Sequence, residues 1–216
     1  MNKVIVLDTE TTNDLDCPIV YDIGWAVIDT DTEKILATRS YVVEEVFTDT
    51  ELMASAFFID KIPQYWADIA AGKRNMKPLR YIRAALANMC AEYGIKQIYA
   101  HNAIFDWKSC TLSQRYLTSS KYRYFFPYGV DICDTLRMAR QILGKDEKYT
   151  TFCYENDYLT KNLRIRYTAE IIYRFLSGNL EFEEEHTGLE DVMIEKEILL
   201  HCLRENPEFD ARLWKN

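Results

Sequence analysis

The hydrophobic pattern of the chain begins at residues 3–7, where Lys3 is followed by four consecutive β-branched or long aliphatic side chains. A short run of this kind, followed by polar residues, is typical of a strand that is buried on both faces of a sheet. Two further strands are predicted at residues 21–30 and 34–43, around a polar turn at residues 29–33. The N-terminal part of the chain therefore predicts three consecutive strands.

Helical spacing of apolar residues appears first at residues 79–93, and Gly94 directly after them is a natural helix C-cap. Further along, short apolar runs alternate with helical segments. We expect strands at residues 97–100 and 129–133, and helices from His101-Asn102 to about residue 117 and over residues 134–143, 167–176 and 189–203. This order predicts an α/β fold, in which helices cover a sheet with an antiparallel edge.

Two long segments, residues 44–78 and 145–166, interrupt this alternation as irregular or partly helical insertions. Insertions of this length in a compact domain are often functional. No linker or repeat divides the chain, and only 7 Gly and 5 Pro punctuate it. We therefore expect residues 1–216 to form one domain with insertions near 44–78 and 145–166.

Composition narrows the class of protein. The chain has 216 residues, of which 48% are hydrophobic, and a formal net charge of −8. It is long enough to bury a core without disulfides, and its acidic balance argues against a protein that coats nucleic acid by bulk charge. No apolar run approaches the ~18 residues of a membrane span, so we expect no membrane contact. Six widely spaced cysteines favour free thiols in a reducing cytoplasm.

The first candidate site is the pair Asp8 and Glu10, two residues apart at the end of the first strand. Alternation along a strand puts both carboxylates on one face. Adjacent carboxylates repel each other unless one keeps a proton or a cation joins them, and a hard divalent ion with oxygen ligands does so. Taken alone, the pair also fits a solvated strand end.

The second candidate site is HNAIFD at residues 101–106, which follows a short apolar strand. If Asn102 caps a helix, Asp106 lies one turn in and on the same side. Functional groups of open α/β sheets gather at the carboxyl ends of strands, so Asp106 can converge on the first pair. The alternative is an Asp that only stabilises the helix dipole.

The third candidate site is HTGLED at residues 186–191. Thr187 and Glu190 have the spacing of a capping box, which makes Thr187 the N-cap of the last helix. His186 then lies on the entry loop and Asp191 in the first helical turn, so both can approach one site. Taken alone, a surface His and a dipole-stabilising Asp explain the segment better.

Together the three segments supply four carboxylates and one imidazole: Asp8, Glu10, Asp106, Asp191 and His186. Two divalent ions balance the four negative charges, and oxygen ligands suit Mg²⁺ or Mn²⁺ better than zinc. Such a pair fits in-line displacement at phosphorus, in which one ion activates water and the other stabilises the leaving 3′ oxygen. His186 titrates near neutrality and would take the proton from water.

These segments resemble the three motifs of the DEDDh-type 3′-5′ exonuclease family, through D-x-E-T at residues 8–11, H-N-x-x-F-D at 101–106 and H-x-x-x-x-D at 186–191. The His five residues before the last Asp separates this type from one with Tyr four residues before it, where this chain has Thr187. The family includes the proofreading epsilon subunit of bacterial DNA polymerase III and ribonuclease T.

The resemblance implies a ribonuclease H-like α/β fold, with a central mixed five-stranded sheet of order 3-2-1-4-5 and an antiparallel strand 2, flanked by helices. It implies hydrolysis of phosphodiester bonds from the 3′ end, with release of nucleoside 5′-monophosphates. The four carboxylates would bind two Mg²⁺ or Mn²⁺ ions, and His186 would be the general base. Candidates for holding the 3′-terminal nucleotide are Thr9, Thr11 and Asn102.

The sequence leaves substrate and partner open. Single-stranded DNA is favoured, and RNA 3′ ends are the alternative, because a reader of the 2′-hydroxyl depends on detailed pocket shape. Resemblance to the epsilon subunit implies a DNA polymerase or another replication or repair partner, and resemblance to ribonuclease T implies a homodimer. A second class of function is a non-catalytic nucleic-acid-binding or polymerase-associated module, which would not require the five site residues.

Three charged segments invite a functional interpretation. Residues 121–128, KYRYFFPY, interleave basic and aromatic side chains, and residues 145–167 have a similar character. Aromatic rings hold single strands by stacking on bases, although packing on the core or in an oligomer is the more common role. The acidic residues 181–185 are expected to form a solvated loop. Alternatively, they hold the loop of His186 open and raise the pKa of His186.

Overall fold

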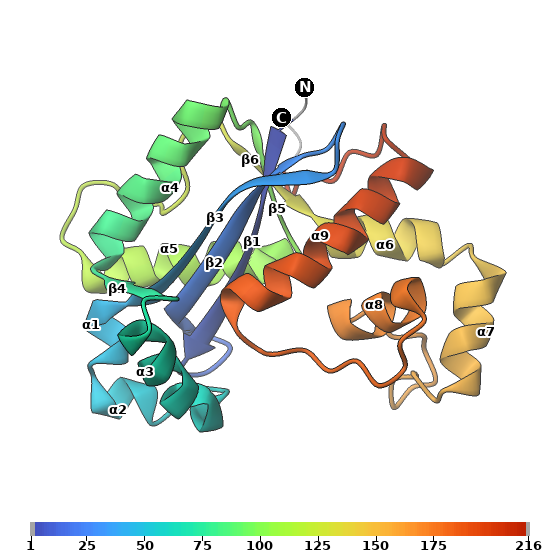
Figure 1. Cartoon of the computed structure of the whole chain (residues 1–216), viewed down its shortest axis with the longest axis horizontal. Helices are drawn as coiled ribbons and strands as arrows, with labels where there is room; N and C mark the ends of the chain where they lie inside the picture. The colour runs from blue at the N-terminus through green and yellow to red at the C-terminus, as the bar shows by residue number, and fades with distance from the viewer. Residues whose placement is uncertain (1–2, 215–216) are drawn as a thin grey trace.

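A six-stranded mixed sheet forms the centre of the computed structural model, which describes residues 3–214 (Figure 1). The strands are β1 (Lys3–Thr12), β2 (Ile19–Asp29), β3 (Lys34–Val43), β4 (Asn75–Lys77), β5 (Gln97–Ala100) and β6 (Asp131–Asp134). Their order is β4-β3-β2-β1-β5-β6, and β2 is antiparallel to both of its neighbours. The α/β class and the relative order of the five predicted strands are confirmed.

The sheet has one strand more than the five predicted. The additional strand β4 is three residues long and pairs in parallel with the end of β3. Its sequence, Asn-Met-Lys, has no apolar run and lies inside the segment 44–78, so the hydrophobic pattern carries no signal for it. It extends the outer edge of the sheet and leaves the order of the other strands unchanged.

Burial on both faces explains the continuous apolar runs of the inner strands. All 11 residues of β2 are buried. Along β1, Ile5 and Leu7 belong to the core on one face, whereas Val4 and Val6 belong to the core on the other. By the same alternation, Asp8 and Glu10 lie on the face of β1 that carries Val4 and Val6.

Helices cover both faces of the sheet (Figure 1). They are α1 (Glu44–Phe47), α2 (Thr50–Met53), α3 (Ile62–Ala70), α4 (Leu79–Tyr93), α5 (Ala103–Leu117), α6 (Thr135–Leu143), α7 (Glu147–Glu155), α8 (Ala169–Ser177) and α9 (Gly188–Glu205). Residues of α4 and α5 contribute to the core with Ile5 and Leu7. Residues of α6, α8 and α9 contribute to the core with Val4 and Val6.

The bounds of several elements agree with the pattern. β3, α4 and β5 span the predicted residues, and Gly94 after α4 has a φ of 68°, the left-handed conformation of a C-cap. β1 is longer than predicted, because its pairing with β2 continues to Thr12 past a register shift between Glu10 and Thr11. Asp8 and Glu10 therefore lie within the strand, which holds their backbone in place.

Both insertions carry secondary structure. Residues 44–78 contain α1, α2, α3, β4 and a 3-10 turn at Ile59–Lys61, whereas residues 145–166 contain α7 and a bridge between Leu159 and Ile165. Among the helices of residues 3–214, none combines the length and the apolar character that crossing a membrane requires.

Candidate active site

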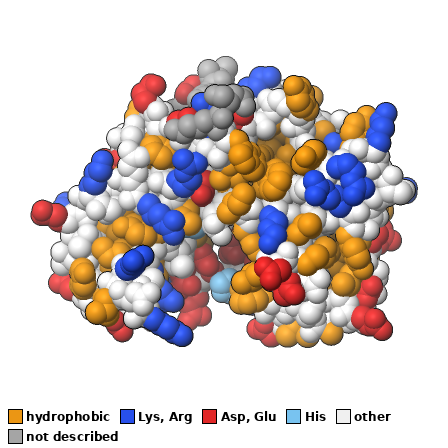
Figure 2. Space-filling model, turned by 180° about the vertical axis from the view of Figure 1, so that it is seen from behind, with side chains coloured by type: hydrophobic (Ala, Val, Ile, Leu, Met, Phe, Trp, Pro, Cys, Tyr) orange, Lys and Arg blue, Asp and Glu red, His pale blue; other side chains and the backbone are white. Residues whose placement is uncertain are grey.

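A cavity of about 1170 Å³ opens where the carboxyl ends of β1 and β5 meet the first turns of α5 and α9. Its lining includes all five residues predicted to carry chemistry: Asp8, Glu10, Asp106, His186 and Asp191. Acidic side chains and a histidine show in the hollow on the face seen from behind (Figure 2). The fold therefore brings together three segments that are far apart in the sequence.

Asp8 and Glu10 bring two carboxylates into the cavity from one strand. Burial, followed by the charge of Asp191, raises the pKa of Glu10 to about 9. Burial and the charges of Glu195 and Glu10 raise the pKa of Asp8 as well. These carboxyl groups keep protons that water-exposed carboxyls lose, which is the situation that a bound divalent cation relieves.

Asp106 faces the pair from the first turn of α5, where it is only 3% exposed. Burial raises its pKa to about 7, and the hydroxyl of Thr9, which donates a 2.8 Å hydrogen bond to Asp106 Oδ1, opposes that shift. The side chain of Asn102 does not cap α5, contrary to expectation. Asn102 has a φ of 69°, and its backbone N–H donates to Asp134 Oδ1 instead.

Asp22 of β2 holds the start of α9. The backbone N–H of Gly188 donates to Asp22 Oδ2 at 2.8 Å, and the hydroxyl of Tyr65 donates to the same oxygen at 2.7 Å. Arg74 completes this buried group with an ion pair to Asp22 of 3.4 Å. A Cβ on Gly24 would lie 2.3 Å from the backbone nitrogen of Leu189, so α9 approaches β2 as closely as a glycine permits.

The predicted capping box is wrong in its hydrogen bonds. Thr187 occupies the N-cap position, but its hydroxyl donates to Glu190 Oε2 rather than receiving a backbone N–H. Arg74 Nη2 lies 2.7 Å from the same carboxylate. A charged guanidinium binds the carboxylate of Glu190 more strongly than the backbone N–H of Thr187 would in a capping box. The N–H of Thr187 donates instead to Asp191 Oδ2, which orients that carboxylate.

His186 lies on the loop before α9 with a φ of 53°. Its ring stacks on Phe58, with centroids 4.1 Å apart and planes inclined by 7°. Burial lowers the pKa of His186 and outweighs the carboxylate of Glu170, which acts in the opposite direction. Glu185 of the acidic run raises this pKa, as expected, but its effect is smaller than that of burial. The lowered pKa favours the neutral imidazole, which is the form that accepts a proton.

The donor set fits a divalent metal ion. Ligand atoms of Glu10, His186 and Asp191 all lie within 4.8 Å of one another. Asp8 and Asp106 line the same cavity beside this group. Carboxylate oxygens with one imidazole nitrogen suit Mn²⁺ or Mg²⁺, and His186 is near enough to be a ligand as well as a base.

Sequence reasoning missed a fifth buried carboxylate, Glu195, which also lines the cavity. It is 3% exposed, and its Oε2 has no hydrogen-bond partner among the described residues. Burial raises its pKa, and the charges of Asp106 and Asp191 add to that effect. Its position four residues after Asp191 on a predicted helix was the available signal, because residues so spaced share a helix face.

The acidic run before His186 is only partly solvated. Glu183 and Glu185 are exposed, as a solvated loop predicts. Glu184 lines the cavity instead, and burial raises its pKa to about 7. Its carboxylate lies 3.8 Å from Nδ1 of His186, so one member of the run belongs to the site.

The residues predicted to hold a terminal nucleotide lie in different places. Asn102 is exposed at the cavity, and Thr9 lines it while its hydroxyl is engaged with Asp106. Thr11 is buried and is not part of the described lining. Residues 163–169 also line the cavity and include Arg164 and Arg166, so the lining combines cations with the carboxylates.

No protein-family model and no curated protein matches the sequence. Solved structures do match. The nuclease domain of 3′hExo, a DEDDh family member bound to rAMP, aligns with a TM-score of 0.65 at 12% identity over 99% of this chain and 98% of that one. A 3′-exonuclease described with the histone mRNA stem-loop gives a TM-score of 0.61 at 13% identity over 97% and 85% of the two chains.

A third structure is the zinc-bound ExoI–ssDNA complex of E. coli, with a TM-score of 0.62 at 12% identity. The alignment covers 96% of this chain but 42% of that larger one. The chain has the fold of the DEDDh-type 3′-5′ exonucleases, a ribonuclease H-like α/β fold. At this level of identity the likeness concerns the fold.

Proposed function

We propose that this protein is a metal-dependent 3′-5′ exonuclease, a single exonuclease domain over residues 1–216 that releases nucleoside 5′-monophosphates. The observation that carries the proposal is the convergence of Asp8, Glu10, Asp106, Asp191 and His186 on one cavity. A purely structural role would not require so many buried carboxylates with raised pKa values in one place.

In this proposal, the four carboxylates hold two Mg²⁺ or Mn²⁺ ions. Bound there, the ions would supply Lewis-acid stabilisation of charge at the scissile phosphate and at the leaving 3′ oxygen. His186 takes the proton of the attacking water through its neutral imidazole, and Phe58 fixes the plane of that ring by stacking. Asp22 and Arg74 position the start of α9, which carries Asp191, and the loop before it, which carries His186.

The substrate in this proposal is the 3′ end of single-stranded nucleic acid, with DNA favoured and RNA as the alternative. Thr9, Thr11 and Asn102 remain the proposed contacts to the terminal nucleotide. The six cysteines, all free, support a cytoplasmic location. A polymerase or repair partner and a homodimer are further proposals that rest on the family resemblance alone.

Digestion of 5′-labelled single-stranded DNA and RNA under single-turnover conditions tests the function. The expected result is a ladder that shortens from the 3′ end with Mg²⁺ or Mn²⁺ and disappears with EDTA. His186→Ala abolishes the ladder, whereas His201→Ala, which lies in α9 but outside the cavity lining, retains it. Absence of shortening in every metal would favour the non-catalytic binding module.

A further inference from the structure

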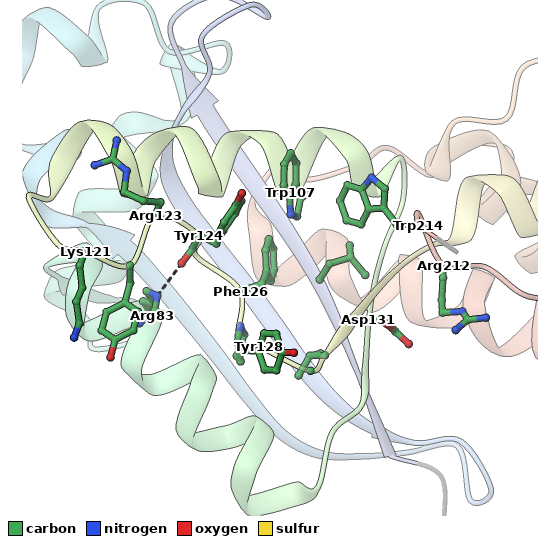
Figure 3. A pocket seen from close by; sticks show the side chains of 15 residues that line it. Arg83, Trp107, Lys121, Arg123, Tyr124, Phe126, Tyr128, Asp131, Arg212 and Trp214 are labelled. Atoms are coloured by element: carbon green, nitrogen blue, oxygen red, sulfur yellow. Dashed lines mark hydrogen bonds between the residues drawn. The ribbon is translucent and has the colours of Figure 1, made fainter. Parts of the chain in front are cut away.

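A second cavity of about 670 Å³ lies beneath α5 (Figure 3), and its lining includes none of the five predicted site residues. The segment 121–132, which carries the basic and aromatic run noted in the sequence, forms most of its wall. Arg83 of α4, Trp107 of α5, Arg212 and Trp214 complete it. We call it the aromatic–basic cavity.

Aromatic side chains occupy the middle of the aromatic–basic cavity. Trp107 and Trp214 lie side by side under α5 with ring centroids 4.9 Å apart, and Tyr124 lies 6.4 Å from Trp107 on its other side (Figure 3). Tyr122 and Tyr124 are more than half exposed, and Tyr128 is fully exposed at the rim. Rings that are held in place and yet open to solvent are surfaces on which flat ligands stack.

Cations lie at both ends of this row. Arg83, Lys121 and Arg123 lie at one end and Arg212 at the other (Figure 3). The guanidinium of Arg83 is 5.0 Å from the ring centre of Tyr122, and the ammonium of Lys121 is 5.5 Å from it. Within residues 3–214, none of Arg83, Lys121 and Arg123 forms an ion pair, whereas Arg212 pairs with Asp210. Arg83 donates from Nε to the carbonyl oxygen of Tyr124 at 3.1 Å (Figure 3). Lys121 and Arg123 are exposed and able to meet anions, on a chain with a net charge of −8.

We propose that the aromatic–basic cavity is a second nucleic-acid site, which binds nucleotides of a single strand whose 3′ end is in the active site. Stacking rings flanked by cations match bases joined by phosphates, and this chemistry is tolerant of sequence. The carboxylates of an acidic peptide would pair with the cations, but such a peptide offers no flat bases to stack on the exposed rings. The inference rests on the proposed nuclease function.

The two cavities share one helix. Trp107 of the aromatic–basic cavity directly follows Asp106 of the active site on α5. Neighbouring helical residues point about 100° apart, so the two side chains reach different sides of the same helical turn. In this proposal, a single strand of nucleic acid that bends around the first turns of α5 reaches from one cavity to the other over the protein surface.

Binding of oligonucleotides of increasing length tests the proposal. The probes are 5′-fluorescein-labelled oligo(dT) and oligo(U) of about 2, 4, 8 and 12 nucleotides, measured by anisotropy in EDTA so that no cleavage occurs. The variants are Tyr122→Ala/Tyr124→Ala and Lys121→Glu/Arg123→Glu. The control is Tyr116→Ala, at an exposed tyrosine of α5 that lies outside the cavity.

The expected result is a gain in affinity with length that both double variants reduce about 10- to 100-fold for the longest probes. The tyrosine variant loses stacking on bases, and the charge-reversed variant loses attraction to phosphates. The dinucleotide is bound equally by all proteins. Tyr116→Ala behaves as wild type, and unchanged melting temperatures exclude unfolding as the cause. Equal affinity of wild type and both double variants for every length overturns the proposal.

Cleavage assays on the same proteins separate this inference from the proposed function. If wild type cleaves the dinucleotide and the 12-nucleotide probe, and the double variants cleave both equally well, only the second site is refuted. If wild type binds the long probes through the cavity but cleaves none, the nuclease proposal fails and the binding site stands.

Discussion

The two cavities on either side of α5 differ in what they bury. The candidate active-site cavity gathers carboxylates whose pKa values are raised by burial, including Glu10 to about 9 and Asp191 to about 7. The aromatic–basic cavity gathers rings and cations, and its tyrosines 122, 124 and 128 are open to water. Buried like charges are costly unless a counter-ion is bound, whereas exposed aromatic rings are tolerated singly.

This difference indicates how each region acts. The carboxylates lie on regular elements, β1, α5 and α9, which hold them in fixed positions. A cation site requires such accurate placement of its ligands. The aromatic–basic cavity is formed largely by the segment 121–130, which has no helix or strand and adapts at small cost. Chemistry is therefore expected to fail sharply when the framework moves, and binding to weaken gradually when rings are removed.

The largest expected effect comes from removing a carboxylate of the active site. Asp106→Asn should lower single-turnover cleavage by about 1000-fold or more, because a misplaced metal ion forfeits several kcal/mol of transition-state stabilisation. Asp131→Asn, which changes an acidic residue of the aromatic–basic cavity, is the matched control and should retain activity. Equal activity of the two variants would remove the distinction between the cavities.

The next effect comes from moving the framework without touching a ligand. Gly24→Ala puts a methyl group 2.3 Å from the backbone of Leu189 and must displace the start of α9. Cleavage should fall by about 100-fold, as expected for shifts of about 1 Å in catalytic groups. The melting temperature should fall as well, and the binding of long oligonucleotides at the aromatic–basic cavity should change little. Retained activity would show that α9 does not need this close approach.

Removing the ring that stacks on His186 should have a smaller effect. Phe58→Ala should lower cleavage by about 10-fold, because a supporting contact that orients a functional side chain is worth about 10- to 100-fold. Phe58→Tyr should restore the rate, and Phe57→Ala, at an exposed neighbouring ring, should leave it unchanged. A stacking role is contradicted if Phe58→Ala and Phe57→Ala have equal rates.

The smallest effect concerns the pH dependence of stability without metal. Folding raises the pKa of Glu10 to about 9 and those of Asp106 and Asp191 to about 7, so the folded protein binds more protons than the unfolded chain above about pH 5. Melting temperature should therefore fall as the pH rises from 6 to 9. Mg²⁺ should restore more stability at pH 9 than at pH 6, which differential scanning calorimetry measures directly. The same Mg²⁺ increment at both pH values would contradict cation binding by these groups.

Much of the fold was predictable because local patterns carry it. The apolar runs of β1 and β5 and the helical spacing of α4 are properties of neighbouring residues, and tertiary contacts reinforce them. Strand β4 was not predictable, since three residues without an apolar run pair only because β3 offers a free edge. The predicted capping box does not form, because the carboxylate of Glu190 accepts a hydrogen bond from Arg74, more than 100 residues away in the sequence.

The candidate site follows the same rule. Asp8, Glu10 and Asp106 were found from short spacings at predicted strand and helix ends. Asp22, Tyr65 and Phe58 were not, because they act on α9 and His186 across long sequence separations and belong to no short motif. Glu195 was predictable in part. Its spacing of four residues from Asp191 places both on one helix face, but its burial depends on tertiary packing that the sequence does not show.

Titration with Mn²⁺ tests the central claim most directly, that the buried carboxylates form a site for two divalent ions. Isothermal calorimetry in the presence of a nucleoside 5′-monophosphate should give two Mn²⁺ ions per wild-type chain and per Asp131→Asn chain. Asp191→Asn should lose at least one of them while remaining folded. A wild-type protein that binds no Mn²⁺, or an Asp191→Asn protein that binds as many ions as wild type, would contradict the account.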